Sequence, residues 1–310
     1  MLWEDAVRLG VMIGVAVADT ALPEMIEGVR AAAEAGLDRA YFSQLFSWDA
    51  VTLAALVARE VPGIDVGTAV TQTYPRHPLA LAGQALTAQA ASGNRFILGV
   101  GPSHPEIIEK AFGHSYDRPA RHVREYLTAL VPLLRGEKVD HHGEALTAVG
   151  RTSVPGAVAP PVLLAALGPV MLRIAGELAD GAVTVWTGPR GIGEHVAPTI
   201  GRAAAQAGRP APRVVAGVMV SVTHDPDGVR QSVAAAVDAA GRLPSYRAIL
   251  DRQGMSGVHE TVIAGDEEAV EQAIQAYADA GATEFVASLV GDERERARTL
   301  ALLSAIRGRR

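Results

Sequence analysis

The sequence changes abruptly from apolar to polar in one short stretch. Residues 67–78 read GTAVTQTYPRHP, so that a glycine and a short apolar run lead into Thr, Gln, Tyr, Arg and His before a proline. Small or polar residues also follow four other apolar runs, at Ser43-Gln44, Gly101 to His104, Leu167-Gly168-Pro169 and Trp186 to Arg190. Hydroxyl, amide and imidazole groups can bind a ligand or transfer a proton, and glycine lets a ligand approach the backbone.

Four of these residues have side chains suited to chemistry. His104 is the strongest candidate for acid/base catalysis because imidazole titrates near neutral pH, and Arg190 can stabilise negative charge. Gln44 and Gln72 are neutral hydrogen-bonding groups. A single loop of Gly and Pro is more often an ordinary turn. Several such loops before predicted helix starts, with few acidic groups among them, favour an anionic, phosphate-bearing ligand.

Composition excludes several classes of protein. The chain of 310 residues has no cysteine, which rules out disulfides, thiolate catalysis, iron–sulfur clusters and cysteine-based zinc sites. A net charge of -6 argues against binding to nucleic acid or to an anionic membrane surface. The adjacent His141 and His142 would point to opposite faces of a strand, so we expect no metal site. No pair of carboxylates follows the apolar runs, which argues against glycoside hydrolysis.

The N-terminal segment contains an apolar stretch over residues 9–18. This stretch is too short to span a bilayer, and Glu4 and Asp5 precede it where a targeting signal would have a basic cluster. We therefore expect a buried first strand and a soluble, cytoplasmic protein.

The polar stretches must be positioned by the elements that precede them. Three segments, 31–43, 175–186 and 276–288, each pass from an Ala-rich helix end through glycine into a short apolar run. Glycine often ends a helix, and a strand buried on both faces forms a continuous apolar run. Eight such strands are predicted, at residues 9–17, 39–43, 66–70, 96–100, 162–166, 181–186, 214–222 and 284–289.

Eight strands that alternate with helices predict an α/β fold, a (β/α)8 barrel of the TIM type. A doubly wound open sheet is the rival fold, but it would usually have fewer strands and a phosphate loop after the first. Residues 136–160 and 241–265 do not fit simple βα units, and we predict them as insertions after the fourth and the seventh strand. We predict one elaborated domain over residues 1–310, with its active site at the carboxyl ends of the strands.

Three blocks of the sequence resemble a known family. They are GTAVTQTYPRHPLALAGQALTAQAASGNRFILGVGPSH at 67–104, SYDRPARHVREYLTALVPLLRGEKVDHHG at 115–143 and VLLAALGPVMLRIAGELADGAVTVWTGP at 162–189. Together they are similar to the luciferase-like monooxygenase superfamily, and most of all to the branch that uses coenzyme F420, a deazaflavin, instead of FMN. The resemblance covers nearly the whole chain and implies the same barrel.

The resemblance places the cofactor at the strand ends. It implies a non-prolyl cis peptide bond at Ala69–Val70, against which the deazaflavin ring leans, and Gln72 as a hydrogen-bond partner of that ring. Leu167, Gly168 and Val170 match the helix start that receives the phosphate side of the cofactor. The cofactor-binding set is completed by the strand-end residues Ser43, Gly101, Pro102, Ser103 and His104.

The resemblance also suggests substrate contacts. Thr187 and Arg190 match positions that hold the substrate's phosphate in relatives that oxidise sugar phosphates. Three aromatic residues are predicted to line an apolar or planar substrate, namely Phe46, Tyr74 and Trp186.

The chain departs from the family pattern at the predicted catalytic positions. Relatives that oxidise alcohols carry an Asp-His pair after the second strand and a Glu after the fourth, whereas Gln44, Leu45 and His104 stand here. The missing base argues against dehydrogenation of an alcohol. It favours reduction of an activated C=C or C=N bond by reduced F420, with His104 as the proton donor and Gln44 as the second catalytic candidate.

Two other functions remain open. One is an FMN-dependent monooxygenase, although the loop after the fourth strand lacks the Gly-Trp pair that is usual in FMN-using relatives. The other is a non-catalytic F420-binding protein, which the absent Asp-His pair would allow. We expect a small-molecule substrate, neither a nucleic-acid nor a membrane partner, and a homodimer, since dimers are usual among the relatives.

Overall fold

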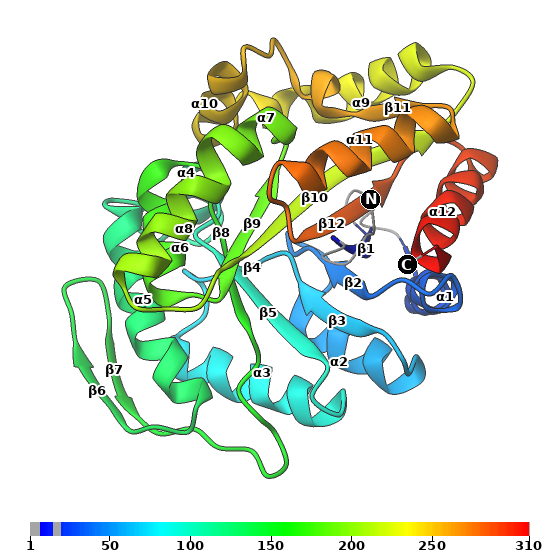
Figure 1. The fold of residues 1–310 in the computed structure, drawn as a ribbon. Coiled ribbons are helices and arrows are strands. Elements are labelled where there is room, and N and C mark those ends of the chain that lie inside the picture. The colour runs from blue at the N-terminus through cyan, green and yellow to red at the C-terminus, as the bar shows by residue number, and fades with distance from the viewer. Residues whose placement is uncertain (1–6, 15–19, 310) are drawn as a thin grey trace.

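The computed structural model describes residues 7–14 and 20–309. Eight parallel strands close into a barrel, because β10 pairs with β12 on one side and with β9 on the other (Figure 1). In spatial order these strands are β10 (Arg213–Val222), β12 (Glu284–Leu289), β1 (Arg8–Ile13), β2 (Arg39–Phe42), β3 (Asp65–Thr68), β5 (Phe96–Gly101), β8 (Val162–Ala165) and β9 (Gly181–Val185). The predicted (β/α)8 barrel is therefore confirmed.

Helices surround the barrel, and most of them begin in the same way (Figure 1). Proline occupies the first turn of many helices, where its fixed φ and missing N–H cost nothing. The side-chain carboxylates of Asp49, Asp225, Asp266 and Asp292 cap the starts of four helices, and the helix capped by Asp225 also has a proline in its first turn. The helices that pack on the barrel are α1 (Leu22–Glu34), α2 (Ala50–Glu60), α3 (Pro78–Ala91), α5 (Pro119–Leu134), α6 (Pro169–Leu178), α8 (Ala197–Gln206), α11 (Glu267–Asp279) and α12 (Glu293–Gly308).

The apolar core has two layers. The larger layer lies between the strands and the surrounding helices. The smaller one fills the barrel itself, and each of its members comes from a different strand: Tyr41, Ile97, Leu163, Val183, Val215 and Val286. The barrel is thus packed with side chains, and the carboxyl-terminal rim is where such a fold carries its chemistry.

The two predicted insertions are confirmed. After β5 the chain forms α4 (Pro105–Lys110), then α5, and then an antiparallel hairpin of β6 (Val139–His142) and β7 (Thr147–Gly150), which projects from the barrel in Figure 1. After β10 the chain forms α9 (Pro226–Gly241), α10 (Pro244–Gln253), a 3-10 helix (Val258–Thr261) and the short strand β11 (Ile263–Gly265). A further short helix, α7 (Pro189–Gly191), and a π-helical turn (Ile192–Val196) follow β9.

Three predicted strand boundaries need comment. The strand predicted at 66–70 ends at Thr68, and the chain resumes pairing only at β4 (Thr71–Gln72), which lies beside β5. The strand predicted at 181–186 ends one residue early, because Trp186 has a φ of 51° and leaves the extended conformation. The strand predicted at 9–17 ends at Ile13, and its residues 15–17 lie outside the described ranges.

Within residues 7–14 and 20–309, every helix is too short or too polar to cross a membrane.

Candidate active site at the strand ends

The site is built on the break between β3 and β4. The peptide bond between Ala69 and Val70 is cis, which confirms the prediction for this bond. Gly101, on the neighbouring strand β5, is required beside it, since a Cβ there would come within 2.9 Å of the Val70 side chain. Backbone and side chains are therefore packed tightly under the predicted ring position.

Gln72 follows directly, on β4. Its side chain is only 4% exposed, and its Oε1 has no hydrogen-bond partner among the described residues. A buried amide oxygen without a partner costs free energy, of the order of 1–3 kcal/mol, so its environment is incomplete without a donor. This orphaned acceptor lies where the predicted cofactor ring would meet the strand end.

Gln44 and Ser43, at the end of β2, lie beside this strand. Gln44 Oε1 accepts hydrogen bonds from the Thr71 hydroxyl at 2.9 Å and from the backbone N–H of Ala50 at 3.2 Å. The amide oxygen therefore joins β2, β4 and the start of α2. The catalytic role of Gln44 stays a prediction.

His104 occupies the loop after β5 and precedes α4. Ser103 has a φ of 61°, and its carbonyl accepts a 2.7 Å hydrogen bond from the hydroxyl of Tyr116, which fixes this loop. His104 is half-buried, and this burial lowers the pKa of its imidazole although the nearby Glu106 carboxylate acts in the opposite direction. The histidine is therefore mostly neutral at neutral pH.

An aromatic group that sequence reasoning did not include joins two predicted residues. The ring of Tyr246, on α10, lies 4.7 Å from the ring of His104 and 4.2 Å from that of Trp186. Tyr246 lies in the insertion, more than 50 residues beyond the last predicted site residue. Its only sequence signal was a tyrosine at the start of a predicted extra helix.

Tyr74 belongs to a second aromatic group. Its ring stacks on Tyr116 at 5.3 Å and on His122 at 3.8 Å, and His122 Nε2 lies 3.0 Å from the Thr73 hydroxyl. Burial lowers the pKa of His122 to about 4, so its imidazole is neutral. Tyr74 therefore packs against the start of helix α5 and the segment that precedes it.

The start of α6 is open and fits the predicted phosphate side of a cofactor. Gly168 is the exposed N-cap, no side chain of the described residues caps the helix, and its first turn has no acidic residue. Within the part of the chain that the structure describes, a Cβ at Gly168 would meet no atom within 4 Å, and Val170 is 45% exposed. The Leu167 carbonyl is held by His195 Nε2 at 2.8 Å. Free backbone N–H groups at such a terminus attract anions.

The predicted substrate residues differ in accessibility. Thr187 is buried, and its hydroxyl donates to the Val185 carbonyl at 2.9 Å. Arg190 extends over the surface and pairs with Glu194 at 3.0 Å. Phe46 is 66% exposed and lies 6.2 Å from the ring of Phe112. The structure therefore places Trp186 and His104 against the same ring, that of Tyr246, but it does not bring Thr187 and Arg190 together around one group.

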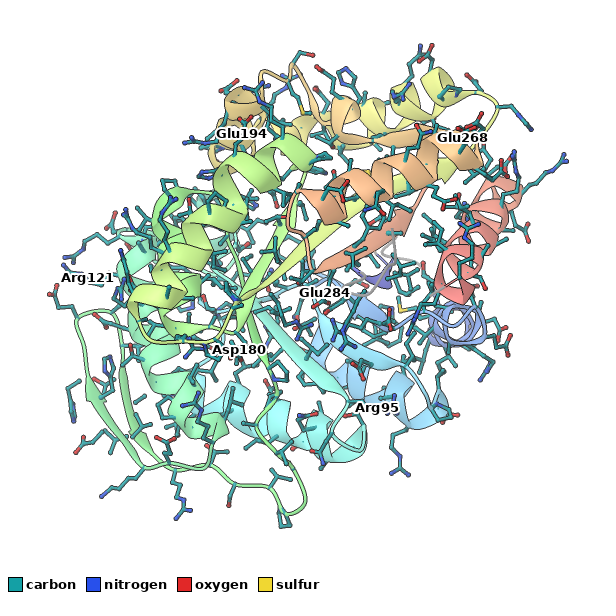
Figure 2. All side chains as sticks on the ribbon, in the orientation of Figure 1. Arg95, Arg121, Asp180, Glu194, Glu268 and Glu284 are labelled. Carbon is teal, nitrogen blue, oxygen red and sulfur yellow. The ribbon has the colours of Figure 1, made fainter. Side chains whose placement is uncertain are left out.

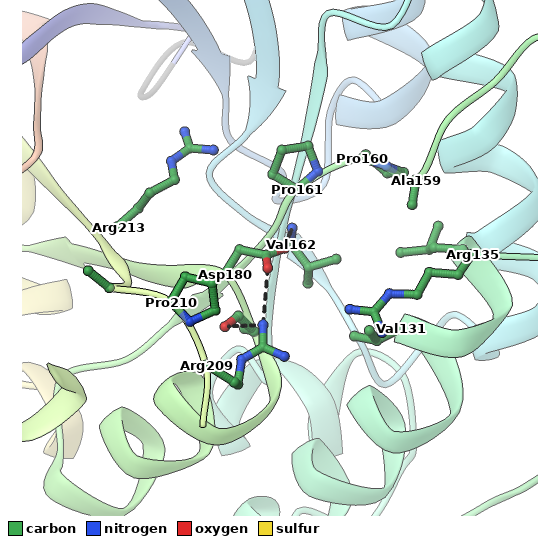
Figure 3. A pocket seen from close by; sticks show the side chains of 13 residues that line it. Val131, Arg135, Ala159, Pro160, Pro161, Val162, Asp180, Arg209, Pro210 and Arg213 are labelled. Carbon is green, nitrogen blue, oxygen red and sulfur yellow. Dashed lines mark hydrogen bonds and ion pairs between the residues drawn. The ribbon is translucent and has the colours of Figure 1, made fainter. Parts of the chain in front are cut away.

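His104 lines neither of two cavities, although the predicted substrate residue Tyr74 lines the second of them. One of about 470 Å³ lies where β8, β9 and β10 begin, at the opposite end of the barrel from His104. Figure 3 shows Arg209 beside it, hydrogen-bonded to Asp180. That end of a barrel serves stability rather than chemistry. The other cavity, of about 620 Å³, lies between the chain after β4, the start of α5 and the β6–β7 hairpin.

Fold and candidate site together define a class of protein: a (β/α)8 barrel with a cis peptide after the third strand and polar side chains at its carboxyl-terminal rim. The model of the luciferase-like monooxygenase family matches residues 6–303. The chain belongs to this family, which is a family of oxidoreductases.

Two relatives are similar in sequence. Rv3520c of Mycobacterium tuberculosis, whose name assigns it provisionally to the coenzyme F420-dependent oxidoreductases, is 31% identical over 54% of this chain. That match spans about half of the relative's length, 53%. The 5,10-methylenetetrahydromethanopterin reductase of Methanolobus tindarius is 28% identical over 76% of this chain and 72% of its own.

Two solved structures share the fold. The coenzyme F420-dependent tetrahydromethanopterin reductase from Methanopyrus kandleri has a TM-score of 0.81 at 23% identity, and the match covers 96% of this chain and 97% of that one. The oxygenating constituent of 3,6-diketocamphane monooxygenase from Pseudomonas putida, in complex with FMN, has a TM-score of 0.77 at 17% identity, over 96% and 97% of the two chains.

Proposed function

We propose that the protein is an F420-dependent oxidoreductase that transfers a hydride between the deazaflavin and a small organic substrate. In the favoured direction it reduces an activated C=C or C=N bond. The names of both sequence relatives support F420 or reductase chemistry. The observation that carries the proposal is the buried Gln72 Oε1, an acceptor without a partner among the described residues at the predicted ring position.

The residues at the strand ends fit this cofactor. A deazaflavin ring has a uracil-like edge with an N–H donor, which matches the unpaired Gln72 oxygen. Val70 and Gly101 would lie against the ring, and the open start of α6 at Gly168 suits the phosphate side. When bound, the reduced ring would supply a hydride.

The chain's own contribution to the reduction is a proton. A hydride added to one atom of C=C or C=N leaves negative charge on the other end of the activated bond, and this charge must be neutralised by a proton. His104 is the candidate donor, since it is an imidazole at the strand ends whose half-buried ring retains access to the site. Trp186, whose ring contacts the same Tyr246 ring as His104, is the candidate substrate contact.

The first test identifies the cofactor by fluorescence titration of the protein with F420 and with FMN. We expect F420 to bind more tightly. Gln72→Leu should weaken F420 binding about tenfold, because one net hydrogen bond is lost. Gln206→Leu, at an exposed position on α8, is the matched control and should bind as the wild type does. FMN binding without F420 binding would overturn the proposal in favour of a flavin monooxygenase. Oxygen consumption by the protein with reduced FMN would then be the expected activity.

The second test asks whether the protein is a catalyst. Reduced F420 is mixed with a panel of enones and cyclic imines, and its reoxidation is followed by absorbance. We expect turnover that His104→Ala lowers at least about a hundredfold, the lower end of the usual contribution of general acid catalysis. Tight F420 binding with no acceptor reduced would instead favour a cofactor-binding protein.

We further propose that the protein acts in the cytoplasm as a homodimer. The absence of cysteine is compatible with a reducing compartment, and the family resemblance supports the dimer. Light scattering should give twice the chain mass of 32.3 kDa. A mass of one chain across the working concentration range would refute the dimer.

A further inference from the structure

Helix α10 belongs to the insertion after β10, yet it contacts the loop that follows β5. The Ser245 hydroxyl lies 3.5 Å from His104 Nδ1, and the Tyr246 ring is tilted against the His104 ring at 4.7 Å. Figure 1 shows α10 beside α7, at the same end of the barrel as α4. The first turn of α10 therefore covers the predicted proton donor.

The same helix also holds the loop that follows β9. Gln253, at its last turn, accepts a hydrogen bond from the Gly188 N–H at 2.6 Å and donates one to the Trp186 carbonyl at 3.2 Å. These contacts lie on either side of Thr187, next to Trp186, whose φ is 51°. Gly191 allows the approach, since a Cβ there would come within 2.8 Å of Gln253 Oε1.

Tyr246 lies between the two loops. Its ring meets Trp186 edge-on at 4.2 Å and His104 on another side, and all three rings are half-buried. Partial exposure of three adjoining rings leaves an aromatic surface that a ligand can contact. Such a surface favours a planar, conjugated molecule over a compact saturated one.

From this arrangement we infer that α10 determines which substrate is reduced. Tyr246 contacts the substrate and positions His104, and Gln253 positions Trp186. The substrate class is a planar, conjugated acceptor whose reducible bond lies between these rings and the cofactor site. This inference rests on the proposed function, because it assigns the acceptor side of the same site.

The environment of His104 provides a readout that needs neither cofactor nor substrate. The titratable groups that face His104 are Glu106, on its own helix α4, and Tyr246, on α10. Burial lowers the pKa of His104 and raises the pKa of Tyr246, so the phenol stays neutral across the working range. Removing the Tyr246 ring should therefore expose the imidazole and raise its pKa toward the ordinary value of 6.5.

The experiment compares Tyr246→Phe, Tyr246→Leu and Gln253→Leu with the control Arg252→Ala, an exposed residue of the same helix. Histidine NMR of the protein alone follows the pKa of His104, with the signal assigned from His104→Gln. Kinetics with reduced F420 compare 4-phenylbut-3-en-2-one, a planar conjugated enone, with the smaller cyclohex-2-en-1-one.

We expect Tyr246→Leu to raise the pKa of His104 and to lower the preference for the phenyl enone about tenfold, while the F420 dissociation constant changes less than about twofold. Tyr246→Phe should retain both properties. Gln253→Leu should raise KM for the phenyl enone several-fold more than it changes kcat, since it displaces a binding surface.

The inference is overturned if the Tyr246→Leu and Arg252→Ala variants have the same pKa of His104 and the same preference between the two enones. It is also overturned if F420 affinity falls in parallel with the preference, because α10 would then support the cofactor rather than the substrate. A wild-type protein that binds F420 but reduces neither enone contradicts the substrate class. A protein that binds no F420 contradicts the proposed function, and the NMR titration then still decides whether Tyr246 controls His104.

Discussion

His104 has the side chain on which the proposed reaction depends most. Burial lowers the pKa of its imidazole below the ordinary 6.5, although Glu106 acts in the opposite direction. At neutral pH only a small fraction of the protein therefore carries the protonated imidazole. A general acid with a pKa below the working pH is a strong donor that is sparsely populated.

This predicts how the reduction depends on pH. If protonated His104 donates the proton, kcat/KM should be highest at low pH and should fall tenfold per unit as pH rises through a midpoint below 6.5. The pH profile of reduced F420 oxidation by an enone measures it. His104→Asn should abolish this fall of kcat/KM with rising pH. If the fall remains in His104→Asn, another group donates the proton.

At the scale of the element, one carboxylate of α5 fixes the turn of the β6–β7 hairpin, which Arg118 and Arg121 also contact through Glu144. The Glu125 carboxylate, on α5, accepts hydrogen bonds from the backbone N–H of Ala145 at 2.8 Å and from those of Glu144 and Leu146 at 3.2 Å each. Gly143 is required there, because a Cβ would overlap Glu125 Oε2. Both oxygens of the carboxylate act as acceptors, which is a role that an amide cannot fill.

We therefore expect Glu125→Gln to loosen the hairpin turn. Its NH2 group would face a backbone N–H, and hydrogen bonds to a charged acceptor contribute about 1.5–3 kcal/mol. Amide exchange at residues 143–146 should accelerate at least about tenfold, with the barrel strands unchanged. Glu144→Gln, at a carboxylate that is 65% exposed, is the control and should have little effect. Equal protection in the two variants would contradict this role of Glu125.

The elements differ in how far the sequence predicts them. All eight barrel strands were predictable, because strands buried on both faces form apolar runs such as those over β8 and β9. The contact of α10 with His104 was not, since it joins residues 141 positions apart and depends on tertiary packing. Gln44 illustrates the same limit, because its type indicated a polar role but could not show that its oxygen bonds Thr71.

At the scale of the whole molecule, the barrel interior contains an ionic cluster at the end opposite the site. Glu284, on β12, is 2% exposed and lies 2.5 Å from both Arg39 on β2 and Arg213 on β10. The Tyr41 hydroxyl donates to the same carboxylate at 2.9 Å. Figure 2 shows Glu284 among the strands, whereas Glu194 and Glu268 lie on outer helices. The three strands that it joins are far apart in sequence, so no local pattern predicts the cluster.

This cluster should make the stability of the barrel depend on Glu284 and on pH. Burial alone would raise the pKa of Glu284, but the hydrogen bonds and charges of Arg213 and Arg39 outweigh it and hold the pKa below the ordinary 4.5. A carboxyl with a lowered folded pKa stabilises the fold above its unfolded pKa, and this contribution is lost as pH falls through the folded value. Urea unfolding measured from pH 7 to pH 3 should show this loss.

Glu284→Gln should lower the free energy of unfolding at pH 7 by about 3–5 kcal/mol, since it leaves two buried guanidinium groups without their carboxylate. The deficit should shrink as pH falls below about 4.5, where the unfolded wild type takes up a proton that its folded carboxyl still excludes. Asp65→Asn is the matched control, because Asp65 lies 3.5 Å from Arg39 with a side chain 37% exposed, and its loss should cost less than about 1 kcal/mol. If the two variants were equally stable at pH 7, the pairing of Glu284 with Arg39 and Arg213 would contribute no net stability. The barrel would then derive its stability from its apolar layers alone.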